Sequence, residues 1–223
     1  TVRRMSRLIL CVLFIALAAP FHWTTSVSVS VAAAAEPLNV VVTLPVLKDW
    51  VQQVGGTHVR VVSLMTGYES EHTYSPKPSD LVAVRKATLL FEVGAGLEVW
   101  VSSLVKNAGN ASLQVITTSK DIPLIHDQSE SAGEAHGHAH TAGNPHVWLD
   151  PSSAATMVQH ISNAMAAADP THAADYRANT TTYLQSLTRV QDETLGLLQQ
   201  LPNRAVIVHH PAWPYFARRY EIR

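Results

Sequence analysis

The chain has 223 residues, a length that allows one or two domains of ordinary size. Its formal net charge is −1 and it has no block of Lys and Arg, so it lacks the electrostatic footprint of a nucleic-acid-binding protein, and we expect no such partner. Twelve residues are histidine. Neutral imidazole is a preferred zinc ligand, and this excess therefore raises the question of metal binding before any motif is considered.

Residues 1–35 predict a cleavable secretory signal peptide. Three arginines precede an apolar run from Leu8 to Ala19, and small residues continue to Ala35. The run is shorter than the roughly 20 residues that a membrane-spanning helix needs, although an uncleaved anchor is the alternative. Cys11, the only cysteine, lies inside the run. A metal site in the mature chain would therefore use nitrogen and oxygen ligands.

Between residues 36 and 150, apolar β-branched runs alternate with segments of helical spacing. We expect strands at 38–43, 58–65, 88–93 and 113–117, and helices at 45–54, 78–86 and 100–107. This alternation predicts a doubly wound α/β lobe with a parallel sheet.

Residues 126–143 interrupt the pattern and are predicted to form a loop rich in Ser, Gly, Ala, Glu and His. Within it, His136, His138 and His140 alternate with small residues. Such a tract indicates an auxiliary metal-acquiring segment, and a solvated linker with incidental histidines is the alternative.

A helix pair is predicted over residues 151–202. Asp150-Pro151 and Asp169-Pro170 each combine an N-cap residue with a proline at the first helical position. The second helix has an apolar stripe over some 30 residues, which corresponds to about 45 Å. A rod of that length is better suited to bridging two lobes than to lying within one.

Residues 203–223 predict the start of a second lobe. Ala205–His209 is expected to be a buried strand, and 211–220 to open a helix. One strand and one helix cannot bury a sheet face, so we expect this lobe to be incomplete here. The predicted fold class is thus α/β, with two doubly wound lobes bridged by a long rigid helix.

His72 is the first candidate metal ligand, because it follows the end of a predicted strand, where open α/β sheets bind ligands. Glu69 and Glu71 add negative potential that favours a cation. The alternative is an ordinary surface-loop histidine.

Two further candidates lie later in the chain. His146 stands between a proline and a capped helix, a fixed backbone that suits a ligand, although it could be a turn histidine packed on Trp148. Of His209 and His210, at most one can face a given cleft, because neighbours in a strand point to opposite faces. His58, His160 and His172 have no supporting context and are expected at the surface.

Three segments together resemble the zinc/manganese class of ABC-transporter solute-binding proteins, the periplasmic zinc-uptake type in particular. They are Glu71-His-Thr-Tyr-Ser-Pro-Lys-Pro-Ser-Asp80, Asn144-Pro-His-Val-Trp-Leu-Asp-Pro151 and His210-Pro-Ala-Trp-Pro-Tyr-Phe216. The resemblance covers Leu38 to the end of the chain. It implies two α/β lobes with a metal between them, periplasmic location and delivery of the metal to a membrane permease.

The same resemblance implies His72 and His146 as ligands from the first lobe and His210, not His209, from the second. A fourth ligand, an acidic residue or water, would lie beyond residue 223. The histidine-rich loop is similar to that of zinc members. We therefore expect a monomeric Zn²⁺-binding protein and not an enzyme.

Two alternatives stay open. A manganese or iron carrier of the same architecture would not need the histidine-rich loop. A zinc hydrolase would also use three histidines and an open position, but it needs a nearby general base, and the sequence has no H-E-x-x-H motif.

Overall fold

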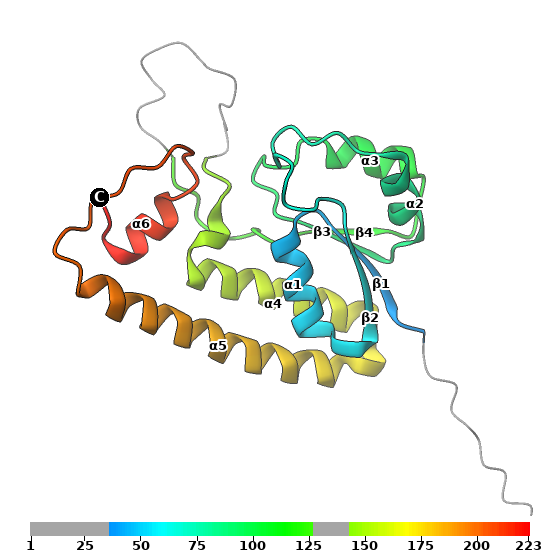
Figure 1. Cartoon of the computed structure of the whole chain (residues 1–223). Coiled ribbons are helices and arrows are strands. Elements are labelled where there is room, and N and C mark those ends of the chain that lie inside the picture. The colour runs from blue at the N-terminus through cyan, green and yellow to red at the C-terminus, as the bar shows by residue number, and fades with distance from the viewer. Residues whose placement is uncertain (1–35, 127–142) are drawn as a thin grey trace, which may run out of the picture. The chain divides into compact units, whose positions relative to one another are not determined.

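Four parallel strands form the sheet of the computed structural model, which describes residues 36–126 and 143–223 (Figure 1). They are β1 (Leu38–Val42), β2 (Val59–Ser63), β3 (Leu89–Glu92) and β4 (Gln114–Thr117), in the order β2-β1-β3-β4. Val40 pairs with Val61 on one side and with Leu89 on the other. β1 and β3 are almost entirely buried, as expected for apolar runs in the middle of a parallel sheet.

Helices cover both faces of this sheet (Figure 1). On one side lie α1 (Pro45–Gly55), α4 (Pro151–Ala168) and α5 (Ala173–Gln199), and on the other α2 (Pro78–Lys86) and α3 (Val101–Ala108). Short 3₁₀ turns lie at Gly56–His58, Val147–Leu149 and Pro170–His172, and α6 (Pro214–Tyr220) comes last. The α/β fold with a parallel sheet and a long helix is confirmed.

The core lies between the sheet and its helices. Leu47, Phe91, Met157, Ile161 and Tyr176 are completely buried there. Each large side chain removed from water in this way contributes about 1.5–3 kcal/mol before conformational entropy is subtracted. These contacts give the sheet a rigid carboxyl edge on which a site can be built.

The helix pair begins differently at its two aspartates. Asp150 caps α4 as predicted, since its carboxylate accepts the backbone N–H of Ser152 at 3.2 Å. The Asp169 carboxylate instead accepts hydrogen bonds from His172 Nδ1 and the Tyr176 hydroxyl, each at 2.7 Å. A 3₁₀ turn lies between Asp169 and the start of the next helix. α5 therefore starts at Ala173, and its 27 residues span about 40 Å.

The predicted strand at Ala205–His209 is wrong for this chain. The segment is irregular, its side chains are largely exposed, and Ile207 is fully so. Its backbone bonds go to the chain end, where Val206 N donates to Arg223 O and Arg223 N to Arg204 O. A strand requires a neighbour, and within residues 143–223 no second strand pairs with this one.

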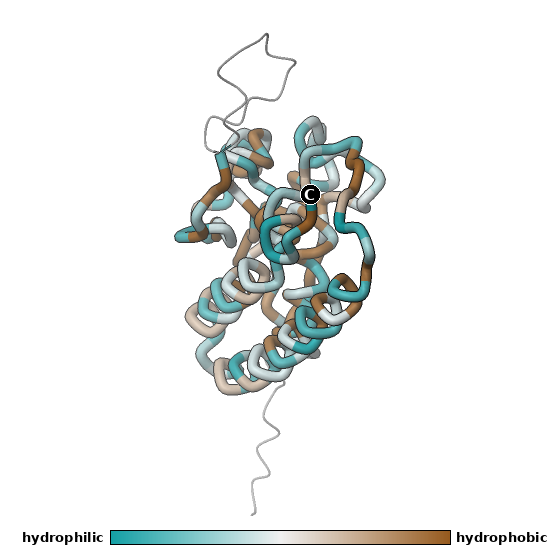
Figure 2. The backbone as a smooth tube through the Cα atoms, turned by 90° about the vertical axis from the view of Figure 1, so that its left-hand side faces the viewer, coloured by the Kyte–Doolittle hydropathy of each residue, from teal (hydrophilic) through white to brown (hydrophobic). Residues whose placement is uncertain are grey.

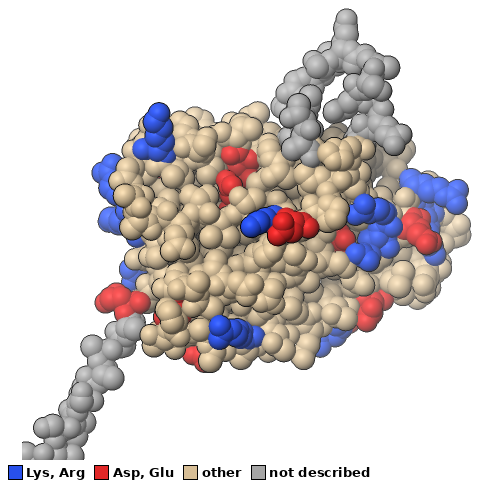
Figure 3. Space-filling model, turned by 180° about the vertical axis from the view of Figure 1, so that it is seen from behind, with Lys and Arg blue, Asp and Glu red and all other residues tan. Residues whose placement is uncertain are grey.

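Hydrophobic and hydrophilic residues alternate along the helices, as amphipathic packing requires (Figure 2). Charged side chains are scattered over the face shown in Figure 3, in keeping with a charged content of 15%. Among the described residues, no helix has the length and apolar character needed to cross a bilayer. The predicted signal peptide, residues 1–35, lies outside the described residues.

Candidate metal centre

Four side chains that are far apart in the sequence meet in one cluster. Glu71, His72, His146 and His210 each offer one nitrogen or oxygen atom, and these atoms all lie within 4.8 Å of one another. The structure thus brings together the three histidines singled out in the sequence. It adds the carboxylate of Glu71, which the sequence indicates only as a source of negative electrostatic potential.

Glu71 and His72 lie in the loop that follows β2. Trp100, which packs beside Tyr74, donates its indole N–H to the Glu71 carbonyl at 3.1 Å. The Tyr74 hydroxyl lies within hydrogen-bonding distance of Leu64 O and of an Asp80 carboxylate oxygen. These contacts hold the loop against the carboxyl edge of the sheet, and the His72 side chain is only 10% exposed.

The Glu71 carboxylate points at the histidines. Its Oε1 lies 3.5 Å from His146 Nε2 and 3.9 Å from His72 Nε2. The hydrogen bond with His146, reinforced by the charges of both histidines against the opposing effect of burial, lowers the pKa of Glu71 to about 2. The carboxylate is therefore ionised at neutral pH and supplies one negative charge to the cluster.

His146 is held from three directions. Its Nδ1 lies 2.9 Å from the side-chain oxygen of Asn144, which also accepts the His146 backbone N–H at 3.1 Å. Its ring contacts Trp148, with ring centroids 5.2 Å apart. His146 therefore packs on Trp148 and also lies in the cluster. The side chain is 3% exposed.

His210 reaches the cluster from a turn ahead of α6. Its Nε2 lies 3.2 Å from His146 Nε2, and its ring lies 5.6 Å from that of His72. His209 is exposed and lies outside the cluster, and the strand whose alternation was expected to turn the two histidines to opposite faces is absent. The two neighbouring histidines differ in exposure because of the turn before α6 and not because of a strand.

The spacing of the donor atoms suits a tetrahedral ion. Zinc bonds of about 2.0–2.1 Å place tetrahedral ligand atoms roughly 3.3–3.4 Å apart, close to the separations of 3.2 and 3.5 Å from His146 Nε2. Three neutral imidazoles and one carboxylate would carry a charge of −1, which partly neutralises a divalent cation. The separation of 3.9 Å between Glu71 Oε1 and His72 Nε2 is longer, and all four donor atoms lie within 4.8 Å of one another, so the donors would move closer together around such an ion.

The other histidines of residues 36–126 and 143–223 do not join the cluster. His58 and His172 stack with centroids 3.9 Å apart, and His160 Nδ1 lies 2.8 Å from Thr118 O. All three are half-buried rather than simply on the surface. His136, His138 and His140 lie outside the described residues.

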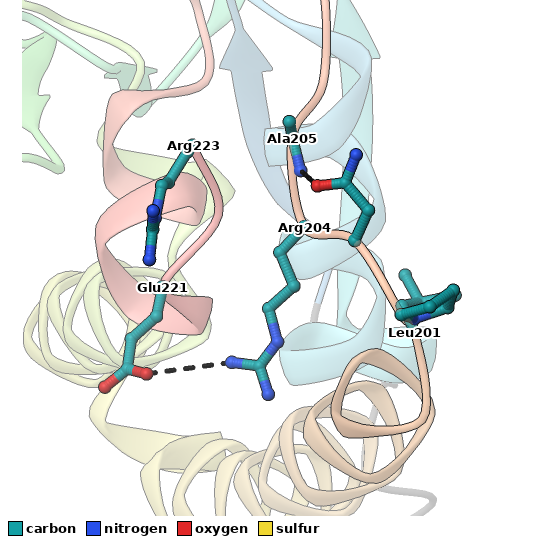
Figure 4. Close-up of a pocket in the computed structure, with 7 residues that line it drawn as sticks. Leu201, Arg204, Ala205, Glu221 and Arg223 are labelled. Carbon is teal, nitrogen blue, oxygen red and sulfur yellow. Dashed lines mark hydrogen bonds and ion pairs between the residues drawn. The ribbon is translucent and has the colours of Figure 1, made fainter.

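A separate pocket of about 500 Å³ lies beside the chain end (Figure 4). It is lined by residues 201–205, Glu221 and Arg223, and Arg204 forms an ion pair of 3.6 Å with Glu221. It contains none of the four cluster residues. Only one of its lining residues, Ala205, belongs to the segment 205–209 that is predicted as a strand.

The parallel α/β fold and the matches to known proteins place the chain in the zinc/manganese class of ABC-transporter solute-binding proteins. The chain belongs to the family described as zinc-uptake complex component A, periplasmic, whose model matches residues 40–223. This family is one of solute-binding proteins and not an enzyme class.

Solved structures and curated relatives agree with that assignment. A crystal structure of ZnuA is 31% identical, with a TM-score of 0.75, and the match covers 84% of this chain and 69% of that one. A Treponema pallidum protein provisionally described as metal-binding is 30% identical over 84% of this chain and 61% of its own length. The manganese-binding lipoprotein MntA of Halalkalibacterium halodurans is 29% identical, and the match covers 83% of this chain and 58% of that protein. The chain thus spans about three-fifths of the length of these curated relatives.

Proposed function

We propose that this chain belongs to a protein that captures Zn²⁺ outside the cytoplasm and delivers it to an ABC-type membrane permease. The observation that carries the proposal is the convergence of Glu71, His72, His146 and His210 on one point. Residues 1–35 would be its signal peptide, and 36–150 the lobe that supplies three of the four ligands. The segment 126–143, with His136, His138 and His140, would collect zinc for the centre.

The donor set favours zinc over the alternatives within the family. Imidazole nitrogens suit zinc, whereas manganese prefers oxygen donors, and only one of the four donors here is oxygen. A manganese carrier is the second candidate, because MntA is among the relatives. Zinc and manganese titrations of the same protein separate the two.

The geometry also weighs against a zinc hydrolase. Catalytic zinc keeps an open position for water, whereas the four donors here would complete a tetrahedron. Glu71, the nearest carboxylate, would then be a ligand and not a general base. A filled coordination sphere suits capture and transport.

Competition titration with a chromophoric chelator tests the proposal. We expect His72→Ala to lower zinc affinity by more than about 100-fold, since a removed ligand costs more than the 10- to 100-fold typical of groups that support ligands. His209→Ala, which removes the exposed neighbouring histidine, is the matched control and should bind like the wild type. Equal binding by His72→Ala and wild type would refute the proposed centre.

A further inference from the structure

The carboxamide of Asn144 contacts two segments that each carry a histidine of the cluster. Its Oδ1 lies 2.9 Å from His146 Nδ1 and accepts the His146 backbone N–H at 3.1 Å. Its Nδ2 donates to the carbonyl of Pro211, the residue after His210, at 2.7 Å. One side chain therefore joins ligand segments that are 64 residues apart.

The orientation of this amide follows from its backbone partners. A backbone N–H can only donate and the Pro211 carbonyl can only accept, so Oδ1 must face His146 and Nδ2 must face Pro211. Because Oδ1 is an acceptor, His146 Nδ1 must carry the proton. With Nδ1 engaged by Asn144, Nε2 is the ring nitrogen of His146 that faces the cluster, beside Glu71 Oε1 and His210 Nε2, and it is the nitrogen that a metal ion would bind.

The main chain of Asn144 is held as well. The buried Tyr215 of α6 donates its hydroxyl to Asn144 O at 2.6 Å and accepts the backbone N–H of Ile125 at 2.9 Å. Asn144 N donates to Ile125 O at 2.8 Å. The position of the amide is therefore determined by α6 and by residue 125, and not by the metal ligands alone.

We propose that Asn144 is a positioning residue of the metal centre, which sets the tautomer of His146 and fixes the His210 segment against it. The inference rests on the proposed zinc-binding function. It goes further by assigning to one uncharged side chain the coupling of ligands from the two ends of the site. Groups that hold a metal-bound histidine typically contribute 10- to 100-fold in affinity.

Two substitutions separate the two roles. Asn144→Ala removes all three side-chain hydrogen bonds, two with His146 and one with Pro211, and we expect zinc affinity of the full chain to fall about 10- to 100-fold. Asn144→Asp keeps an acceptor for His146 but cannot donate to Pro211, so we expect a smaller loss. Asn110→Ala is the matched control, because the Asn110 amide also bonds to backbone at both ends, at Ala87 and Ser112, away from the cluster.

A second readout needs no metal. In ¹⁵N NMR of the metal-free chain, Nδ1 of the His146 ring should carry a proton in the wild type and in Asn144→Asp, and should be only partly protonated in Asn144→Ala. Melting temperatures establish that each variant is folded. If Asn144→Ala does not fold, the Asn144→Asp comparison still decides the role of the Pro211 bond.

The outcomes discriminate between the two proposals. Zinc affinity in Asn144→Ala within twofold of the wild type, or a wild-type His146 without a proton on Nδ1, overturns the inference and leaves the proposed function standing. Wild-type affinity in Asn144→Asp overturns the role of the Pro211 bond. A wild-type chain that binds no zinc at all overturns the proposed function and the inference together.

Discussion

Glu98 buries a carboxyl group at the carboxyl edge of the sheet. It accepts the Thr43 hydroxyl at 2.7 Å and the backbone N–H groups of Val93 and Gly94 at 2.8 and 2.9 Å. Thr43 follows β1, and Val93 and Gly94 follow β3. The side chain thus ties two neighbouring strand ends together beneath the loops that carry the candidate centre.

This carboxyl group makes the stability of the metal-free chain depend on pH. Burial raises the pKa of Glu98 from 4.5 to about 7, although the three donors oppose the rise. A folded-state pKa above the unfolded value means that the folded state binds more protons, so stability is lost as pH rises from about 4.5 to about 7. The unfolding free energy of the wild type should therefore fall between pH 4.5 and 7, and in Glu98→Gln this fall should be smaller by roughly 1–3 kcal/mol.

Urea denaturation at several pH values measures that difference. Subtracting the Glu98→Gln curve from the wild-type curve removes the titration of the histidines, which both proteins share. Glu36→Gln changes an exposed carboxyl and is the matched control, with no expected effect. Parallel curves for wild type and Glu98→Gln would contradict the predicted role of burial.

The sequence identifies three of the four cluster residues but does not separate Glu71 from Glu69. Both are acidic, both precede His72, and only the loop conformation distinguishes them. Glu69 bends back to accept the backbone N–H and hydroxyl of Thr66 at 2.9 and 2.7 Å, while Glu71 faces the histidines. Glu71 is therefore a candidate for the fourth ligand within this chain, and a fourth ligand beyond residue 223 stays a prediction.

At the scale of elements, Asp150 links α4 to α6. It caps α4 through Ser152 N and accepts two hydrogen bonds from the Arg219 guanidinium, at 2.7 and 2.9 Å. Burial alone would raise the pKa of Asp150, but the Arg219 and Ser152 contacts hold it below the usual range. The helix that follows His210 is thereby attached to the helix that follows His146.

Substitution of Asp150 should therefore affect two elements at once. We expect Asp150→Ala to lower the unfolding free energy by about 2–4 kcal/mol, because it removes a cap and leaves Arg219 without its carboxylate. Asp150→Asn keeps the cap acceptor and should cost roughly half as much. Chemical denaturation measures both, and the exposed Asp192→Asn should change stability by less than about 0.5 kcal/mol. Equal stability of Asp150→Ala and wild type would contradict this account.

The elements of the first lobe follow from the sequence because their signals are local. Runs such as Leu38–Val42 are apolar and β-branched, and Gly56 ends α1 at a positive φ of 54°. The segment 205–209 carries the same local signal but forms no strand, since a strand depends on a partner that local sequence does not specify. The start of α5 was misplaced because the Asp169 side chain has two competing partners.

At the scale of the whole molecule, apolar exposure is concentrated near the end of the chain. Val190, Leu197 and Leu201, on the later part of α5 and just after it, are 52%, 67% and 48% exposed, whereas Tyr176 and Thr180 near its start are buried. Val206 and Ile207 continue the exposed apolar surface. The stripe predicted along the second helix is therefore packed at one end only.

This gradient predicts unequal local stability. Amides of β1 and β3 should exchange with solvent at rates set by global unfolding, because both strands are buried and paired on both sides. Amides of residues 203–209 should exchange orders of magnitude faster, since the segment is exposed and mostly outside regular structure. Hydrogen–deuterium exchange read by mass spectrometry provides the measurement. Strong protection of 203–209 in the isolated chain would show that the segment is paired after all.

The claim on which the rest depends is that Glu71, His72, His146 and His210 hold one ion. Anomalous diffraction at the zinc edge, from crystals of the zinc-loaded protein, tests it directly. We predict a strong peak about 2.0–2.1 Å from one nitrogen of each histidine and from a Glu71 oxygen. No peak between these four side chains, or zinc bound there without His72, His146 and His210 together, would contradict the account.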